Sequence, residues 1–541
     1  MSLLLKAFPH GRPIPRAFVR SALVLAPVLA MVTVLLPLAD SAEARRPPGN
    51  HRNADAAHGK GHSKARPGAT RKARAHAKAK RVQLKRAQLK RAKAKRAKSK
   101  RPTRVVCQPS RNYVMPATSF FSYPNRSGAE RHAIRKRVLR TINSVWGGPR
   151  SSIGTPLPGN GSIRIATWSF DSWETARALV AARKRGVSVQ VVAAKSANKD
   201  HAAWRWLRKR LGSRLYRPGH PSTASVSSFA RQCRGSCRGP GGTPHAKYFL
   251  FDNVGASHKR HVVVQTSMNL TGRAAWGQWN QAQVMHEPRV YRDFLAVFNQ
   301  ARVGRQVAQP YHVAVIGSQV VHYFFPRPQA TVTEDPIMQN LNAVSCTGAT
   351  AGSPGGRTQI RVIQYAIYSD RGVWIAKKLR SLWNAGCNLA IIYSVASRPV
   401  LRILRSRSGR GPVPMRQSVV KDPWGNIVKY NHSKWMSIVG RFGSSTGAHV
   451  TLSGSANWAR LAFGDDEQMQ RLSNRTETRR HVAAFGKTWR QKSSRPPPGS
   501  GRAAGARTLG RTSADASADT LESIPEEPVF GRGIYRYLTE D

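Results

Sequence analysis

Acidic residues are scarce in this sequence of 541 residues, which contains 25 Asp and Glu against 90 Lys and Arg. The resulting net charge of +65 implies an anionic partner, such as nucleic acid, an anionic membrane or an acidic cell-wall polymer. No set of carboxylates is grouped like a metal-ligand cage, and no glycine-rich phosphate loop of the Walker type occurs. These absences argue against a carboxylate-bound metal centre and against a P-loop enzyme.

Cysteine is also sparse, and no pair of His and Cys residues has the spacing of a zinc site. Outside the cytosol cysteines tend to pair, so we expect disulfides rather than metal binding. Cys233 and Cys237 lie four residues apart and could close a small ring, and Cys346 could pair with Cys387 in the second half. Cys107 is then left over.

One long apolar run, at residues 21–38, follows a segment that carries four basic residues. The sequence Ala42-Glu43-Ala44 then supplies the small-x-small pattern that signal peptidase recognises. We therefore predict a signal peptide at residues 1–44 and a secreted or envelope-associated chain. An uncleaved anchor is the alternative, because the run approaches the ~20 residues that a spanning helix needs. Two prolines within the run, and the Ala-x-Ala site, favour cleavage.

The two ends of the chain have compositions that cannot form a core. Residues 45–104 are mostly Lys, Arg and Ala, with Asp55 as the only acid, and are predicted to be a disordered basic arm. Residues 81–101 of this arm could form a basic helix on an anionic surface. A Pro/Gly-rich linker introduces a second segment predicted to be disordered, the tail at residues 491–541.

The part between these ends repeats itself. Residues 162–192 and 358–393 each read as a strand, a helix ended by glycine, and a second strand. Such a βαβ unit predicts parallel strands with helices on the sheet. The sequence therefore predicts an α/β fold with two lobes, at residues 105–305 and 306–490.

Each lobe carries the same polar set at nearly the same offset. The sets are His245-Ala-Lys247 with Ser267-Met-Asn269, and His432-Ser-Lys434 with Ser455-Ala-Asn457. Apolar residues follow each lysine, which predicts a buried strand, and residues i and i+2 of a strand share a face. His and Lys should therefore project together, as should Ser and Asn. Asp252 lies an odd number of positions after its histidine, so we expect it to face away and to be structural.

These residue types suit a phosphodiester pocket. Lysine and asparagine donate hydrogen bonds to anionic oxygens. A neutral histidine can attack phosphorus, while a protonated one can give its proton to the leaving oxygen. Such a site must hold its two imidazoles in different protonation states.

The duplicated His-x-Lys-x4-Asp pattern with a downstream Ser-x-Asn resembles the signature of the phospholipase D superfamily, over residues 107–490. The resemblance implies two α/β lobes related by a pseudo-twofold axis, one active site between them, a phosphohistidine intermediate, and no metal or cofactor. It implies His245 as nucleophile and His432 as general acid. The groups expected to hold the nonbridging oxygens are Lys247, Lys434, Asn269 and Asn457, with Ser267 and Ser455 as the motif serines.

The sequence departs from the family pattern at two places. Val439 stands where the second motif has its Asp, at the position that matches Asp252. The family also places an acid about ten residues after each Asn, and here Glu467 fits in the second lobe while Asn280 replaces it in the first. We therefore expect Glu467 to orient His432 and Asn280 to orient His245.

The leading functional hypothesis is a secreted phospholipase D that hydrolyses phospholipid head groups or transfers the phosphatidyl group to an alcohol. A metal-independent nuclease of the same superfamily is the main alternative, because the positive charge suits a phosphate backbone. A third reading is a surface protein that binds anionic polymer through its basic arm and whose lobes are vestigial. One chain carries both motifs, so we expect a monomer.

Overall fold

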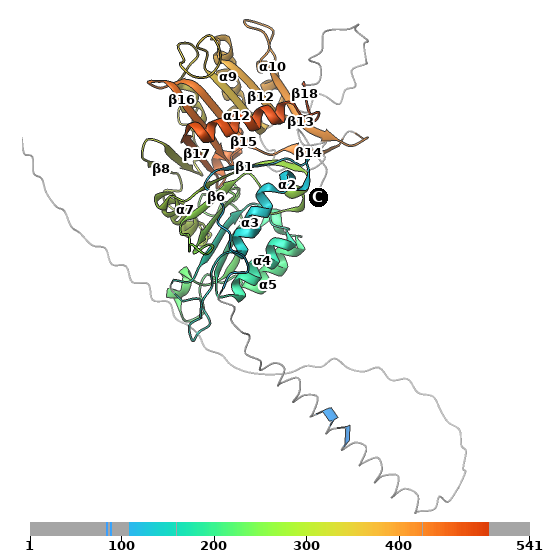
Figure 1. Cartoon of the computed structure of the whole chain (residues 1–541), viewed down its shortest axis with the longest axis vertical. Coiled ribbons are helices and arrows are strands. Elements are labelled where there is room, and N and C mark those ends of the chain that lie inside the picture. The colour runs from blue at the N-terminus through green and yellow to red at the C-terminus, as the bar shows by residue number, and fades with distance from the viewer. Residues whose placement is uncertain (1–82, 85–86, 89–107, 158, 425, 497–541) are drawn as a thin grey trace, which may run out of the picture. The chain divides into compact units, whose positions relative to one another are not determined.

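The computed structural model describes residues 83–84, 87–88, 108–157, 159–424 and 426–496 (Figure 1). The contacts between its residues divide the chain into two compact units, Met1–Arg101 and Pro102–Asp541. In the first unit the four described residues are helical. The predicted signal peptide, the remainder of the predicted basic arm, Cys107 and residues 497–541 of the predicted tail lie outside the described residues. Among the helices of the described part, none has the length and apolarity needed to cross a membrane.

The first half of the second unit forms a seven-stranded sheet in the order β4-β3-β2-β5-β6-β7-β1. The strands are β1 (Ser119–Ser122), β2 (Ser162–Thr167), β3 (Ser188–Ala194), β4 (Phe229–Cys233), β5 (Tyr248–Asp252), β6 (Val262–Thr266) and β7 (Gln278–Met285). The helices are α2 (Gly128–Arg131), α3 (Ala133–Asn143), α4 (Trp173–Lys184), α5 (Ala202–Leu211), α6 (Gly272–Trp276) and α7 (Pro288–Ala301), with short 3-10 turns at Ser196–Asn198 and Pro221–Ser225.

The second half forms a sheet in the order β18-β13-β12-β11-β15-β16-β17-β9-β8, with β10 and β14 at its margins. Its strands are β8 (His312–Ile316), β9 (Val320–Phe324), β10 (Val344–Ser345), β11 (Gln359–Ile367), β12 (Asn388–Ala396), β13 (Met415–Lys421), β14 (Ile427–Asn431), β15 (Lys434–Phe442), β16 (Ser445–Gly454), β17 (Gln468–Ser473) and β18 (Ser494–Arg495). The helices are α8 (Pro336–Asn342), α9 (Ser369–Asn384), α10 (Arg398–Leu404), α11 (Leu461–Gly464) and α12 (Arg475–Trp489).

The two copies of the sequence repeat have the same pattern of strand pairing in the structure. β2 lies between parallel β3 and antiparallel β5, and β11 lies between parallel β12 and antiparallel β15. Gly186 and Gly386 follow the helices of the two repeats with φ of +95° and +93°, the left-handed conformation that glycine adopts most easily at a helix end. The predicted α/β class and the predicted βαβ units are confirmed.

Helices cover both faces of each sheet, which explains why the central strands are apolar along their whole length. In the first sheet α3, α4 and α5 pack on one face and α7 on the other. In the second sheet α8, α9 and α10 pack on one face, and Ala484 and Phe485 of α12 pack on the other. A strand buried on both faces shows no alternation, so its ends are the places left for polar side chains.

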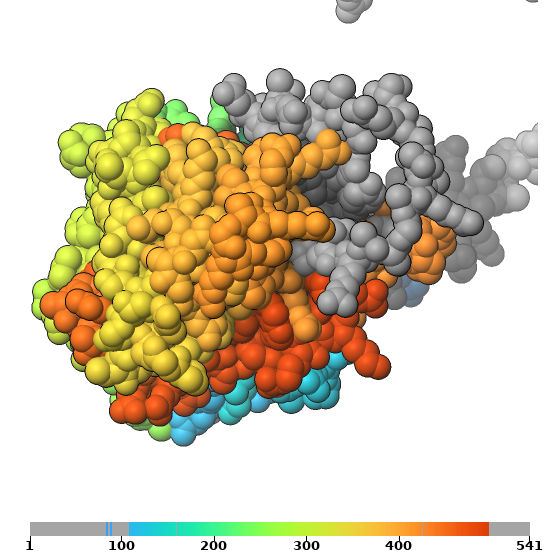
Figure 2. Space-filling model, turned by 90° about the horizontal axis from the view of Figure 1, so that it is seen from above, coloured from blue at the N-terminus to red at the C-terminus, as the bar shows by residue number. Residues whose placement is uncertain are grey.

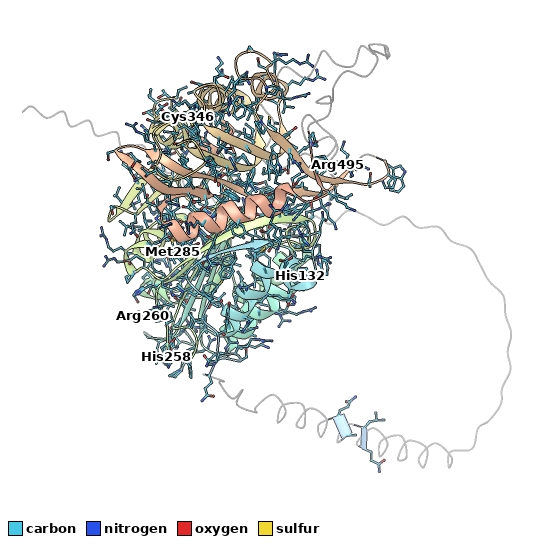
Figure 3. All side chains as sticks on the ribbon, turned by 45° about the horizontal axis from the view of Figure 1, so that its top comes forward. His132, His258, Arg260, Met285, Cys346 and Arg495 are labelled. Atoms are coloured by element: carbon cyan, nitrogen blue, oxygen red, sulfur yellow. A yellow bond between two sulfur atoms is a disulfide. The ribbon has the colours of Figure 1, made fainter. Side chains whose placement is uncertain are left out.

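The described structure continues past residue 490, where the predicted tail begins. Ser494 and Arg495 form β18 and pair with Ser418 and Gln417 of β13 (Figure 3). The prediction of disorder from residue 491 is therefore wrong for its first residues, because the backbone of this segment completes an edge of the second sheet.

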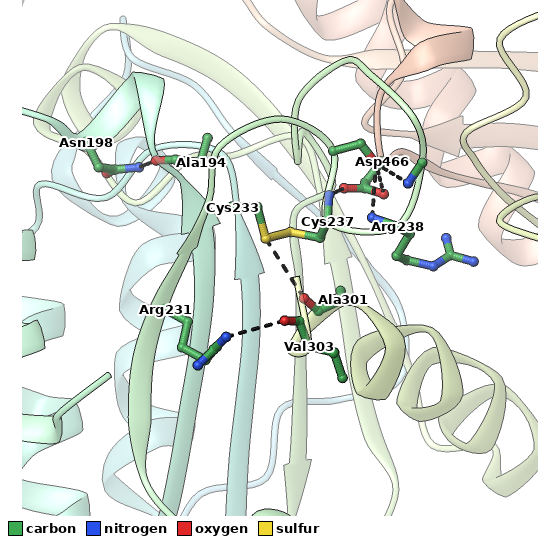
Figure 4. Close-up of a disulfide and its surroundings, with 11 residues drawn as sticks. Ala194, Asn198, Arg231, Cys233, Cys237, Arg238, Ala301, Val303 and Asp466 are labelled. Atoms are coloured by element: carbon green, nitrogen blue, oxygen red, sulfur yellow. Dashed lines mark hydrogen bonds between the residues drawn. A yellow bond between two sulfur atoms is a disulfide. The ribbon is translucent and has the colours of Figure 1, made fainter. Parts of the chain in front are cut away.

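Both predicted disulfides are present. Cys233 pairs with Cys237, and Cys346 pairs with Cys387 across a separation of 41 residues. The first closes a small ring next to Asp466 of the second lobe, whose carboxylate accepts hydrogen bonds from Ser236 Oγ at 2.8 Å and from the Cys237 amide at 2.5 Å (Figure 4). Paired cysteines are typical of chains that fold in an oxidising compartment.

A buried ion pair supports the second sheet beside Asn457. Arg371 and Asp335 are both 0% exposed, and the guanidinium donates through Nε and Nη2 to the two carboxylate oxygens at 3.1 and 3.0 Å. Trp374 Nε1 donates to the same carboxylate at 3.0 Å. Arg371 Nη1 also donates to the carbonyl of Asn457 at 3.1 Å. The pair therefore fixes the backbone of a residue that the sequence predicts to be in the site.

We expect Asp335→Asn to lower the free energy of unfolding by about 3–5 kcal/mol, because the guanidinium of Arg371 would stay buried without a counter-charge. Asp370→Asn is the matched control, since it removes the same charge from a solvent-exposed pair with Arg460 and should cost less than about 1 kcal/mol. Urea unfolding of the full chain measures both. Equal shifts of the two midpoints would contradict the role of the buried pair.

Candidate active site

The two His-x-Lys motifs lie at the starts of matching strands. His245 and Lys247 immediately precede β5, and His432 and Lys434 lie at the start of β15. All four side chains are at most 2% exposed. In each motif the lysine Nζ donates to the carbonyl of its own histidine, at 2.6 Å in the first lobe and 3.0 Å in the second. This contact joins the lysine side chain to the backbone of its own histidine.

Each motif is held by the opposite lobe. The amide of His245 donates to the carbonyl of Asp466 at 3.0 Å, and the amide of His432 donates to the carbonyl of Trp279 at 2.9 Å. β7 and β17 begin beside these carbonyls. The start of β7 therefore supports His432, and the segment just before β17 supports His245.

Two glutamines complete this exchange. The side chain of Gln468 accepts from the Lys247 amide and donates to the Lys247 carbonyl, both at 3.2 Å. Gln281 does the same with Lys434, at 3.1 and 3.2 Å. Both glutamines are at most 3% exposed. We call Gln281 and Gln468 the glutamine clamp, because together they fix each lysine backbone from across the interface between the lobes.

The acid and amide that orient the histidines are also exchanged between the lobes. Glu467 Oε1 lies 2.6 Å from His245 Nδ1, and Asn280 Oδ1 lies 3.3 Å from His432 Nδ1. The sequence predicted the reverse pairing, with each histidine oriented from its own lobe. That prediction is wrong because the start of β7 and the residues just before β17 face the motif of the other lobe, which spacing along the chain does not reveal.

The electrostatics of the two histidines differ as a result. Burial would raise the pKa of Glu467, but the charge of His245, its hydrogen bond and Lys247 together hold that pKa below its ordinary value. Burial lowers the pKa of His432 far below that of a free imidazole, and Lys434, Lys247 and His245 lower it further. These mutual influences indicate that the two motifs face one another across a common site.

The motif serines hold these orienting groups in place. Ser267 Oγ donates to Asn280 Oδ1 at 2.8 Å. Ser455 Oγ contacts Glu467 Oε2 and lies 2.7 Å from Gln468 Oε1. Each serine thus acts within its own lobe on a side chain that crosses to the other one.

The motif asparagines are buried beside the histidines, with Asn269 4% and Asn457 0% exposed. In Asn457 neither atom of the side-chain amide has a hydrogen-bond partner among the described residues. A buried amide in that condition costs free energy unless a ligand satisfies it. Asn457 therefore offers both a donor and an acceptor to a bound group.

Asp252 lies outside this cluster. It ends β5, and its carboxylate receives a hydrogen bond from Arg260 at 3.1 Å within the hairpin that joins β5 to β6. Its counterpart Val439 is 8% exposed in β15. The absence of an acid from the second motif therefore removes a hairpin contact and leaves the buried cluster intact.

The site also contains two aromatic residues that the sequence motifs did not predict. Ser162 pairs with Asp252 and Gln359 pairs with Val439, so β2 and β11 occupy equivalent positions. Trp168 and Tyr365 are then counterparts, and their ring centroids lie 6.2 Å from His245 and 4.7 Å from His432. Aligning the two βαβ units strand by strand would have found this pair.

The arrangement can perform nucleophilic displacement at a phosphodiester. A carboxylate on Nδ1 of His245 keeps the proton on that nitrogen, so Nε2 is the basic atom, and it stabilises the positive imidazole that forms when Nε2 bonds to an electrophile. The amide of Asn280 orients His432 without stabilising its charge, which makes a protonated His432 a strong acid. Two lysines and Asn457 supply donors for anionic oxygens.

Comparison with known proteins adds a family match to this geometry. Residues 159–302 match a family model described as cardiolipin synthase, PLD-like domain. A search of curated proteins finds no match. Among solved structures, phosphatidylserine synthase from Haemophilus influenzae Rd KW20 is similar at 10% identity with a TM-score of 0.44, over 74% of this chain and 91% of that one.

Two further structures are similar over shorter parts. The phospholipase D family member Nuc from Salmonella typhimurium shows 21% identity and a TM-score of 0.24, over 35% of this chain and 93% of that one. Polyphosphate kinase from Porphyromonas gingivalis shows 14% identity and a TM-score of 0.40, over 61% of this chain, which spans 46% of the kinase. The family model thus matches the part of the chain that carries His245, Lys247 and Asn269.

Proposed function

We propose that this protein is a secreted phosphodiesterase that cleaves phospholipid head groups through a covalent phosphohistidine. The observation that carries the proposal is the meeting of two buried His-Lys pairs at one site, with an unsatisfied amide on Asn457 beside them. A phosphodiester has the anionic oxygens that these donors would bind. The match of residues 159–302 to a phospholipase D-like model supports the same class of reaction.

In the first step His245 Nε2 attacks phosphorus and the bond from phosphorus to the head-group oxygen breaks. The proton of His432 passes to that leaving oxygen, and Glu467 stabilises the cationic imidazole through Nδ1. In the second step water attacks the phosphorus, His432 accepts its proton, and the N–P bond breaks. An alcohol in place of water would give transfer rather than hydrolysis. Lys247, Lys434, Asn269 and Asn457 would hold the nonbridging oxygens in both steps.

His245 keeps its role as nucleophile on grounds that differ from the sequence argument. Chain spacing predicted a neutral partner for His245, whereas Glu467 is its partner in the structure. A carboxylate favours the nucleophile because positive charge develops on the attacking imidazole. Burial and then the lysine charges lower the pKa of His432, and the negative phosphate of a bound substrate would offset those charges at the stage where the proton is needed.

A lipid substrate is supported by two exposed tryptophans on elements that adjoin the site. Trp276 ends α6, which follows Asn269, and is 55% exposed. Trp424 lies between β13 and β14, just before His432 in the chain, and is 84% exposed. Indole side chains favour the boundary between water and lipid. Secretion, the basic arm and a monomeric state complete the proposal, and the net charge of +65 makes a nuclease the second candidate.

We expect choline release from phosphatidylcholine vesicles in EDTA, and a loss of at least about 100-fold in His245→Ala and in His432→Ala, because each removes a group that transfers a proton or bonds to phosphorus. His312→Ala, an exposed position on β8, should keep full activity. Plasmid cleavage in EDTA that falls steeply with salt, without choline release, would select the nuclease. Neither activity in the unaltered chain would select a vestigial binding protein.

We expect Asn280→Asp to move the alkaline limb of kcat/KM to higher pH by about one unit or more, because a carboxylate beside His432 favours its protonated form. The direction of the shift follows from the free enzyme. There the lowered pKa of His432 makes it lose its proton at a lower pH than a free imidazole would, and a nearby carboxylate would raise that pKa. The pH dependence of kcat/KM measures it. Asn342→Asp, an exposed position on α8, is the control. An unmoved limb would exclude His432 as the titrating acid.

We expect Trp424→Ala to reduce hydrolysis of vesicles about tenfold while leaving a soluble short-chain phospholipid unaffected, because the indole would act only at a lipid surface. Trp173→Ala, a change at another exposed tryptophan, serves as the control. Rates on the two substrates, compared at equal phosphate concentration, give the result. An equal loss on both substrates would contradict a role of Trp424 at the membrane.

A further inference from the structure

A cavity separate from the histidine site lies in the second lobe. Its volume is about 860 Å³, and it is bounded by the end of α9, the start of β12, the segment that leads into β13, and the end of α12. Figure 2 views the second lobe from the side covered by α9 and α10, in yellow and orange. The cavity borders the beginning of the parallel strands, at Arg361 of β11, whereas Tyr365 meets His432 further along the same strand.

Three arginines line this cavity and no acidic residue does. They are Arg357, Arg361 and Arg410. In the part of the chain that the structure describes, none of them forms an ion pair with a carboxylate, unlike Arg371 and Arg460 of the same lobe. Three positive charges thus converge on a space large enough for a small molecule.

Backbone and aromatic contacts hold two of these guanidinium groups in fixed positions. Arg361 donates to the carbonyl and the side-chain oxygen of Asn388 at 2.7 and 3.0 Å. Arg410 donates to the carbonyls of Trp383 and Cys387 at 3.1 and 2.8 Å, and lies 3.7 Å from the centroid of the Trp383 ring. A guanidinium has five N–H donors, so these contacts fix each group and leave donors for a ligand.

The carbonyl contacts position the charges but do not neutralise them. Burial lowers the pKa of Arg361 to about 10, which reflects a guanidinium that has lost water without gaining a counter-charge. A role limited to hydrogen bonding the backbone near the end of α9 would not require Arg361 to be partly buried, or to lie near two further positive charges. A bound anion would provide the missing charge.

We propose that this cavity binds a small phosphate-bearing anion with at least two negative charges, such as a diphosphate group. Planar guanidinium groups bind phosphate oxygens in pairs, which suits Arg361 and Arg410 on adjoining walls. Arg357 adds a third charge. Its guanidinium packs against Gly386, so closely that a Cβ added at Gly386 would lie 2.4 Å from Nη1 of Arg357. The site lies outside the histidine cluster and does not depend on the proposed phosphodiesterase activity.

The test is thermal unfolding of the full chain against increasing pyrophosphate, at constant ionic strength set with sodium chloride. A ligand that binds only the folded state raises Tm, whereas binding to a segment that is equally accessible in both states does not. We expect Tm to rise, and the concentration for half of the rise to increase at least tenfold in Arg361→Gln and in Arg410→Gln.

Arg479→Gln is the matched control, because it removes one exposed charge from α12 of the same lobe and should leave the response unchanged. Arg410 is exposed, so its variant keeps the test valid if Arg361→Gln fails to fold. A Tm that does not respond to pyrophosphate would overturn the proposal. An equal response in the unaltered chain and in Arg410→Gln would overturn it as well.

Discussion

The glutamine clamp is the contact on which the candidate site depends. Gln281 and Gln468 each satisfy the amide and the carbonyl of a lysine in the opposite lobe, so neither His-x-Lys strand is fixed by its own lobe alone. Loss of Gln468 would remove the side-chain acceptor of the buried Lys247 amide, which is costly, whereas the Lys247 carbonyl also accepts from the Thr266 amide at 2.9 Å. The lobes must therefore dock before either histidine reaches its position, and the site is a property of the interface.

Docking of two similar lobes produces a site whose two halves are chemically different. Contacts across the same interface bring Glu467 to His245 and Asn280 to His432. A symmetric pair of acids would favour the protonated form of both histidines, whereas this arrangement gives a counter-charge to only one. One amide in place of a carboxylate is thus enough to separate the roles that a displacement at phosphorus requires.

Patterns in the sequence predicted the features that depend on local geometry, namely the cysteine pairs and the fold class. Spacing paired the four cysteines, and the repeat of strand, helix and strand predicted the α/β class. The partner of each histidine could not be predicted this way, since the spacing of Glu467 from Asn457 fixes its strand but not the lobe that the strand faces. Trp168 and Tyr365 were missed because they share no residue type, although strand register makes them equivalent.

Asp466 joins the disulfide ring to the site. Its carbonyl accepts the His245 amide, while its carboxylate accepts from Ser236 and Cys237 within the ring (Figure 4). Burial raises the pKa of this carboxyl to about 6, and the two hydrogen bonds act against that rise by favouring the charged form. The ring must therefore keep its shape for the carboxylate to stay ionised at neutral pH. A disulfide gives a segment rich in glycine and arginine that shape, so the covalent bond and the histidine are linked through a single residue.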